Sequence, residues 1–413
     1  MGSSKNKSFL FVMGFTCPFP GAGWHRIFYF AKYFEKMGYN CRILSCFSPS
    51  SFNVKKVVRE EGISIYNMIP CIPVNNPFLL TINKFFALVA SFPFFILFRP
   101  SSIIISIPPV DQLLPVLMLS KIMKCELVID YRDEFEEYLI MHTGKWSFFY
   151  RLLKRVLPYF YKNATLITPV TPAVAENLKK RGVYNIKVIY DGVDTKTFHP
   201  LNKNEIRSEL RLPQDSFIII FLGHVYDPYR VDIIIRALKK LKERAPKRKY
   251  LLLLVGGGNV KNILNLADNL GVNDAVKYFG IVKNPIEVVK ILNSADCGII
   301  PYDDNPLWQR TYSTKIFEYC AVGLPVIATV HANSALAAVI RTNKIGLVAP
   351  PLDIDALASS LETLSNNKEL RNKMSLSALL FAQTYDKEKL ARKLLETIER
   401  ASTLAQSMHY VYE

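Results

Sequence analysis

The sequence lacks the patterns that mark several classes of protein. Its seven cysteines are scattered and never spaced Cys-x-x-Cys, which argues against a disulfide framework or zinc site and favours a reducing compartment. A secretory signal is not expected either, because the apolar stretch at residues 9–15 is shorter than the usual hydrophobic segment of such a signal. We therefore expect a cytoplasmic protein.

Acidic residues are also few. Asp and Glu number 35 against 52 Lys and Arg, and residues 1–125 hold 13 basic but only 4 acidic side chains. Such a chain should attract anions, whether nucleotide phosphates, nucleic acid or an acidic membrane face. No DNA- or RNA-binding motif accompanies the charge, so a nucleic-acid partner is not expected.

No apolar run reaches the roughly 20 residues that span a bilayer. The most apolar segment, residues 85–98, is interrupted by Pro93. We favour a buried helix there over a helix lying in a membrane interface. Residues 145–162 mix basic and aromatic residues at helical spacing, and the same two interpretations apply to them.

Strand-like and helix-like segments alternate along the chain, which predicts an α/β fold with parallel, doubly wound sheets. The pattern restarts after a polar stretch at residues 191–214, and 413 residues are too many for one ordinary core, so two domains are expected. Ligands of such sheets bind at the carboxyl ends of the strands, where we look for chemistry.

Two motifs carry a family resemblance. Residues 191–200 read DGVDTKTFHP, and residues 313–329 read STKIFEYCAVGLPVIAT. Both resemble elements of the GT-B glycosyltransferases of family 4. The segments 251–258, 279–280 and 295–296 fall between them in the order of that family.

The resemblance implies the GT-B fold, with two Rossmann-like domains whose parallel sheets face each other across a cleft. Residues 1–195 would form the acceptor-binding domain, and residues 196–385 the nucleotide-sugar-binding domain. A C-terminal helix at about 386–413 would cross back to the first domain.

The resemblance also implies a retaining, metal-independent hexosyltransferase that needs no cofactor. It would move a sugar from a nucleotide-sugar to a glycan or lipid-linked acceptor. Separately, the basic excess over residues 1–125 and the stretches 85–98 and 145–162 predict an acceptor presented at the cytoplasmic face of an anionic membrane, with the protein in the cytoplasm or attached peripherally to that face. Two alternatives stay open: a nucleotide-sugar 2-epimerase of the same fold, and a non-catalytic subunit that binds sugar nucleotides.

The resemblance places the donor phosphates at a helix that opens near Ser313, where the helix dipole favours an anion. Lys315 would neutralise the diphosphate and Glu318 would bind ribose hydroxyls; a solvated lysine and an i,i+3 ion pair are the alternatives. The family usually has two glutamates separated by seven residues; Glu318 matches the second, but Arg310 stands in place of the first and becomes a candidate phosphate ligand instead. The full candidate donor site is Gly21, Gly23, Gly223, His224, Arg230, Arg310, Ser313, Thr314, Lys315 and Glu318.

The loop at residues 130–134 follows a predicted strand and carries several charges. By resemblance, Asp133 would orient the acceptor hydroxyl, and Arg132 would bind an acceptor phosphate or hold Asp133. These two residues and Lys315 are the candidate catalytic residues, with an internal ion pair as the competing interpretation of the loop. Glu136 and Glu137 are expected to be solvated.

Overall fold

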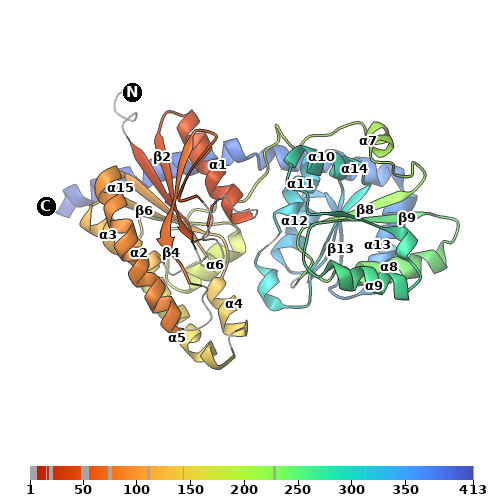
Figure 1. Cartoon of the computed structure of the whole chain (residues 1–413), viewed down its shortest axis with the longest axis horizontal. Coiled ribbons are helices and arrows are strands. Elements are labelled where there is room, and N and C mark those ends of the chain that lie inside the picture. Colours follow the sequence, from red (N-terminus) through yellow and green to blue (C-terminus); the bar gives the residue numbers. More distant parts are fainter. Residues whose placement is uncertain are drawn as a thin grey trace. The chain divides into compact units, whose positions relative to one another are not determined.

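The protein folds as two α/β units (Figure 1). The computed structural model describes residues 7–14, 16–17, 22–47, 55–72, 77–108, 112–142, 144–226, 229–311 and 313–412. Unit 1 extends to Tyr190 and resumes at Lys387, and unit 2 consists of Asp191–Asp386. The predicted α/β class with Rossmann-like parallel sheets is confirmed.

The sheet of unit 1 has seven strands in the order β3-β4-β2-β1-β5-β6-β7. Neighbouring strands are parallel except for the β3–β4 hairpin at one edge. Without β3, this is the doubly wound order of a nucleotide-binding sheet. The strands are β1 (Ser8–Val12), β2 (Asn40–Phe47), β3 (Val57–Glu60), β4 (Ile63–Pro70), β5 (Ser102–Ile107), β6 (Glu126–Tyr131) and β7 (Leu166–Pro169).

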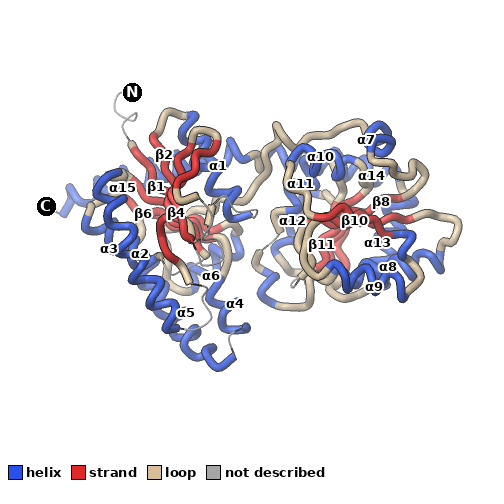
Figure 2. Tube along the Cα trace, in the orientation of Figure 1, coloured by secondary structure: helices blue, strands red, loops and turns tan. Residues whose placement is uncertain are grey.

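The helices of unit 1 lie on both sides of this sheet (Figure 2). The last of them, α15, packs against α1, and there the Tyr39 hydroxyl binds Glu399 at 2.9 Å. The helices are α1 (Ala22–Lys36), α2 (Pro77–Phe98), α3 (Leu113–Ile122), α4 (Phe135–His142), α5 (Ser147–Tyr161), α6 (Pro172–Lys180) and α15 (Lys387–Tyr412), with a 3-10 turn at Gly144–Trp146.

Unit 2 repeats the plan with a six-stranded, all-parallel sheet in the order β10-β9-β8-β11-β12-β13. The strand order reverses between β8 and β11, so the loops after these two strands flank the usual ligand position. The strands are β8 (Phe217–Leu222), β9 (Tyr250–Val255), β10 (Val276–Gly280), β11 (Cys297–Pro301), β12 (Val326–Thr329) and β13 (Gly346–Ala349). The helices are α7 (Lys203–Glu209), α8 (Val231–Arg244), α9 (Val260–Asn269), α10 (Pro285–Asn293), α11 (Lys315–Ala321), α12 (Ala335–Asn343), α13 (Ile354–Asn366) and α14 (Lys368–Thr384), with 3-10 turns at Asn273–Ala275 and Pro306–Gln309.

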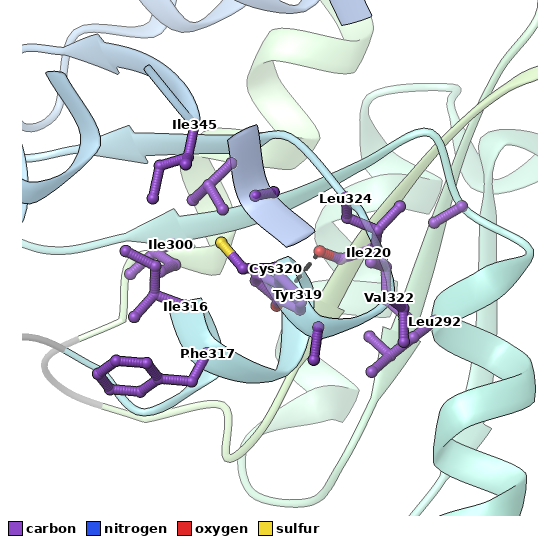
Figure 3. Packing of buried hydrophobic residues seen from close by; sticks show 14 of the residues in the cluster. Ile220, Leu292, Ile300, Ile316, Phe317, Tyr319, Cys320, Val322, Leu324 and Ile345 are labelled. Atoms are coloured by element: carbon purple, nitrogen blue, oxygen red, sulfur yellow. Dashed lines mark hydrogen bonds between the residues drawn. The ribbon is translucent and has the colours of Figure 1, made fainter. Parts of the chain in front are cut away.

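Helix α11 is locked onto the sheet of unit 2 by Tyr319. Its ring lies in an apolar cluster that includes Ile220 and Ile316 (Figure 3), and its hydroxyl accepts a hydrogen bond from the Leu222 backbone at 3.0 Å. A Cβ on Gly298 of β11 would lie 2.3 Å from this ring, so the helix and strand approach more closely than any other residue allows. The first turn of α11 is thereby fixed beside β8 and β11.

The apolar segment at residues 85–98 is part of a longer and more exposed helix than predicted. Helix α2 continues through Pro93, and only 22% of its apolar window Thr81–Phe98 is buried. Ala87 and Phe95 do pack into the core of unit 1, but the preferred prediction of a buried helix is wrong. By length and hydropathy alone the window could cross a membrane, and a single such helix is weak evidence for a span.

A buried ion pair holds unit 1 together. Arg26 of α1 binds Asp130 at the end of β6 at 2.8 Å, and both side chains are almost completely buried. The same guanidinium donates to the carbonyls of Ile189 and Tyr190, while Asp130 accepts from Thr168 of β7 at 3.3 Å. The pair therefore joins a helix, two strands and the segment that leaves the unit.

We expect Asp130→Asn to lower the free energy of unfolding by about 3–5 kcal/mol, because the Arg26 guanidinium would stay buried without a counter-charge. Asp215→Asn is the matched control, since Asp215 and its partner Lys249 are both exposed and such pairs add little. Urea unfolding of the full chain, followed by circular dichroism, measures both. Equal losses in the two variants would contradict the assignment.

Candidate functional site

Lys315, the first residue of α11, is buried without a carboxylate partner among the described residues. Its side chain is 8% exposed, and its ammonium lies 3.7 Å from the ring centroid of Tyr229 and 3.4 Å from Ser313 Oγ. A buried cation normally has an anionic partner, because removing it from water is costly. Cation–π contact and one hydroxyl offset only part of that cost. The site is therefore electrostatically suited to an anion.

Three glycines make room for this arrangement. A Cβ on Gly223, whose φ is +133°, would lie 2.5 Å from Lys315 Cε. A Cβ on Gly256 would lie 2.0 Å from the Gly223 carbonyl oxygen, and one on Gly258 would lie 2.4 Å from His224 Nδ1. The loops after β8 and β9 thus pack on each other and on Lys315 at distances that only glycine permits.

Tyr229 is a site residue that the sequence analysis missed. It stacks on Tyr302 at a centroid distance of 5.3 Å, and its hydroxyl donates to Ser313 Oγ at 3.1 Å. Burial raises the pKa of Tyr229, but the Lys315 ammonium beside it and the hydrogen bonds of the Tyr229 hydroxyl together more than offset this, so the pKa lies below its ordinary value. An aromatic residue next to Arg230, in the loop after a buried strand, was the available signal.

The two candidate arginines of unit 2 lie in different surroundings from Lys315. Arg230 precedes α8 and binds both carboxylate oxygens of Asp232 at 2.8 Å, which neutralises much of its charge. Arg310 is half-buried at the end of the turn Pro306–Gln309. The role of both arginines as phosphate ligands stays a prediction.

The remaining predicted donor residues of unit 2 lie on or beside α11 and the loop after β8. Ser313 is buried next to Lys315, and Thr314 occupies the position before the helix with no side-chain cap. Glu318 is half-buried one turn further along, and His224 is exposed beside Gly258.

The acidic pair in the loop after β11 already has protein partners. Asp304 binds His331 Nε2 at 2.7 Å, and an Asp303 carboxylate oxygen accepts from the Asn305 backbone at 3.0 Å.

In unit 1, the structure brings Gly23 and Arg132 together. A Cβ on Gly23 would lie 2.0 Å from the Arg132 guanidinium, which donates to Ser106 Oγ at 2.8 Å and to the Pro108 carbonyl at 2.7 Å. The arginine is therefore held against the first turn of α1. Gly21 lies outside the described residues.

The loop after β6 differs in part from its prediction. Asp133 is exposed next to the held arginine, as a residue that contacts a substrate can be. Glu136, expected to be solvated, is 1% exposed and binds Arg181 at 3.0 Å and the Tyr131 hydroxyl at 3.1 Å. For Glu136 that prediction is wrong, because α4 turns its carboxylate inward toward Arg181 and the Tyr131 hydroxyl.

Two family models match most of the chain between them. The model described as "Glycosyl transferases group 1" matches residues 202–381, and the one described as "Glycosyltransferase Family 4" matches residues 24–197. The chain belongs to the group 1 glycosyltransferases. Solved structures similar to it show that the chain has the GT-B fold.

The relatives are distant. The D-inositol 3-phosphate glycosyltransferase of Nocardioides sp. is 25% identical over 224 residues, which cover 52% of this chain and 48% of that protein. The glycosyltransferase thus spans about half the length of the curated relatives it matches. Sucrose-phosphate synthase of Thermosynechococcus elongatus superposes with a TM-score of 0.80 at 16% identity, covering 97% of this chain and 100% of that one. Anabaena HepE, solved in complex with UDP-glucose, superposes with a TM-score of 0.68 at 17% identity, covering 95% and 99%.

We expect Lys315→Met to leave the ligand-free glycosyltransferase at least as stable as the wild type, or up to about 2 kcal/mol more stable. The substitution keeps most of the volume and removes a buried charge that has no counter-ion in the part of the chain that the structure describes. Inorganic pyrophosphate should raise the Tm of the wild type but not of the variant, because only the wild type offers the cation. Scanning calorimetry measures both quantities.

Lys261→Met, at an exposed lysine of the same unit, is the control and should keep the pyrophosphate response. A Lys315→Met protein that is clearly destabilised and still responds to pyrophosphate would make Lys315 a structural residue instead.

Proposed function

We propose that this glycosyltransferase transfers a hexosyl group from a nucleotide-sugar to an acceptor with retention of anomeric configuration. The observation that carries the proposal is the buried Lys315 ammonium, which pairs with no carboxylate of the described residues and lies at the reversal point of a doubly wound sheet. A diphosphate is the anion that suits a glycine-lined pair of loops beside such a cation. The Anabaena structure with UDP-glucose supports a donor of this class.

The proposed donor contacts follow from the positions described above and from the family resemblance. Lys315 neutralises the diphosphate, assisted by the backbone amides around Ser313 and Thr314. Glu318 accepts hydrogen bonds from the ribose hydroxyls. The further phosphate ligands that we propose are His224, Arg230 and Arg310, and the proposed close backbone approaches are at Gly21, Gly23 and Gly223.

In the proposed reaction, the bond between the sugar C1 and the diphosphate oxygen breaks, and the nucleoside diphosphate leaves with the electron pair. The acceptor hydroxyl oxygen bonds to C1 on the same face, and its proton passes to the departing phosphate oxygen. Lys315 stabilises the charge that develops on that phosphate. Asp133 orients the acceptor hydroxyl, and Arg132, held by Ser106 and Pro108, positions the acceptor group next to it.

We further propose a glycan or lipid-linked acceptor, bound by unit 1 at the cytoplasmic face of a membrane. The excess of basic residues in the first 125 positions supports this, because it would attract an anionic surface.

A panel of nucleotide-sugars tests the proposal most directly. Release of free nucleoside diphosphate that depends on a glycan or lipid acceptor, with a product of retained configuration by NMR, supports it. Conversion of the nucleotide-sugar to its 2-epimer would indicate an epimerase. Binding of a nucleotide-sugar without any turnover would indicate the non-catalytic subunit, which the arginine at position 310 makes a real alternative.

With an active donor in hand, we expect Lys315→Ala to lower kcat/KM by a factor of about 10²–10³, or about 2.7–4 kcal/mol of transition-state stabilisation. The reason is that the leaving diphosphate would lose its buried cation. Steady-state kinetics measure the loss, and circular dichroism checks the fold. Near-normal turnover in a folded variant would remove Lys315 from the reaction.

We also expect transfer to survive prolonged treatment with EDTA. In this proposal Lys315 does the work that a divalent cation does elsewhere, and the acidic pair after β11 is engaged by His331 and the Asn305 backbone. The measurement is the rate of sugar transfer before and after chelation, which should be equal. Activity that is lost and then restored by Mg²⁺ or Mn²⁺ would assign a metal to Asp303 and Asp304.

A further inference from the structure

Helix α2 presents apolar side chains to the outside of unit 1. Phe85, Val89, Phe92 and Ile96 are 63%, 55%, 47% and 45% exposed, and their spacing places them on one face of the helix. The outer face of a helix on a soluble protein is normally polar. A contiguous exposed apolar surface of this kind indicates a contact with something apolar.

The outer face of α5 has the same character with added positive charge. Phe148, Leu152 and Tyr159 are 77%, 51% and 73% exposed, while the opposite face buries Leu157 and Tyr161. Two arginines, at 151 and 155, lie on the exposed face between the apolar side chains.

A groove joins these two helices into one surface. It has a volume of about 240 Å³ and is lined by Lys84 of α2, by Leu113 and Leu114 of α3, and by side chains of α5 that include Leu153. Helix α3 packs against α2 and exposes Ile122. Figure 1 shows the three helices on one side of unit 1. We call this surface, formed by α2, α3 and α5, the helical face.

The charges on the helical face are of one sign. Helices α2, α3 and α5 contain no acidic residue, and their basic residues are Lys84, Lys121, Arg151, Lys154 and Arg155. Lys154 pairs with Glu137 of α4, whereas Arg151 and Arg155 pair with no carboxylate in the described ranges. Long basic side chains beside aromatic ones can bury their stems while the charged ends meet anions.

We infer that the helical face docks on an anionic lipid bilayer. A bilayer provides a partner for both kinds of side chain on this surface: hydrocarbon for the exposed aromatic and aliphatic side chains, and phosphate for the arginines between them. A soluble protein partner would need a matching acidic and apolar surface, and a second copy would place like charges against each other. The inference rests on the proposed function for its purpose, which is to bring the enzyme to a lipid-linked acceptor.

Vesicle co-sedimentation with the full chain tests this. Phosphatidylcholine vesicles that contain phosphatidylglycerol should bind the protein, and high salt should weaken this binding without abolishing it. Vesicles of phosphatidylcholine alone should bind much less protein. The double variant Arg151→Glu/Arg155→Glu should lower the partition coefficient at low salt at least about tenfold. Phe85→Ser/Phe92→Ser should remove the binding that persists at high salt.

Matched controls lie in unit 2. Leu376→Ser/Leu380→Ser alters an apolar pair on α14 that is 66% and 67% exposed, and Lys247→Glu/Lys261→Glu reverses two exposed charges. Both should bind vesicles as the wild type does.

The inference is overturned if the wild type does not sediment with anionic vesicles at low salt, or if the unit 2 variants lose as much binding as the helical-face variants. It is also overturned if sedimentation velocity shows a dimer that Phe85→Ser/Phe92→Ser dissociates, since a second copy would then cover the face. Vesicle binding involves no sugar transfer, so the two proposals can fail separately. The protein can bind vesicles without transferring a sugar, and it can transfer a sugar without binding vesicles.

Discussion

The arrangement of the loops around the proposed site in unit 2 depends on the burial of one ammonium group, that of Lys315. The Lys315 side chain fits beside the loop after β8 only because Gly223 has no side chain. The Gly223 carbonyl in turn fits against the loop after β9 only because Gly256 has no side chain. Tyr319 fixes the helix that carries the lysine, and Tyr229 supplies an aromatic face in place of a counter-ion. Each of these features is costly or restrictive alone, and together they keep a cation buried at the site where we propose that a diphosphate binds.

Unit 1 also contains a buried cation, but this one is paired with a buried carboxylate. Arg26 is as inaccessible as Lys315, but it has a buried counter-charge in Asp130 and also donates to two backbone carbonyls. Such a group stabilises the fold and has nothing left to offer a ligand. The comparison shows that burial alone does not identify a functional charge; what identifies it is whether the protein itself supplies the partner.

The surface of unit 1 carries a second unsatisfied feature, of a different kind. Helices α2 and α5 expose apolar and basic side chains where a solvated helix would expose a mixture of charges. Exposed apolar side chains are unfavourable in water, just as a buried ammonium is unfavourable without a carboxylate, and Lys315 has none among the described residues. The proposed lipid-linked acceptor would give the protein a use for both features.

The sequence by itself determined the α/β class and the division into two units, because strands buried on both faces are continuous apolar runs; β9 and β11 are such strands and are buried along their whole length. With the family resemblance it also named Lys315. Only the tertiary structure showed that Tyr229 lies under that lysine, that Arg230 is paired with Asp232, that Glu136 is buried and that α2 is exposed. The reason is physical: periodicity tells which residues share a face of a helix or strand, but whether that face meets a neighbour, a counter-charge or solvent depends on elements far away in the chain.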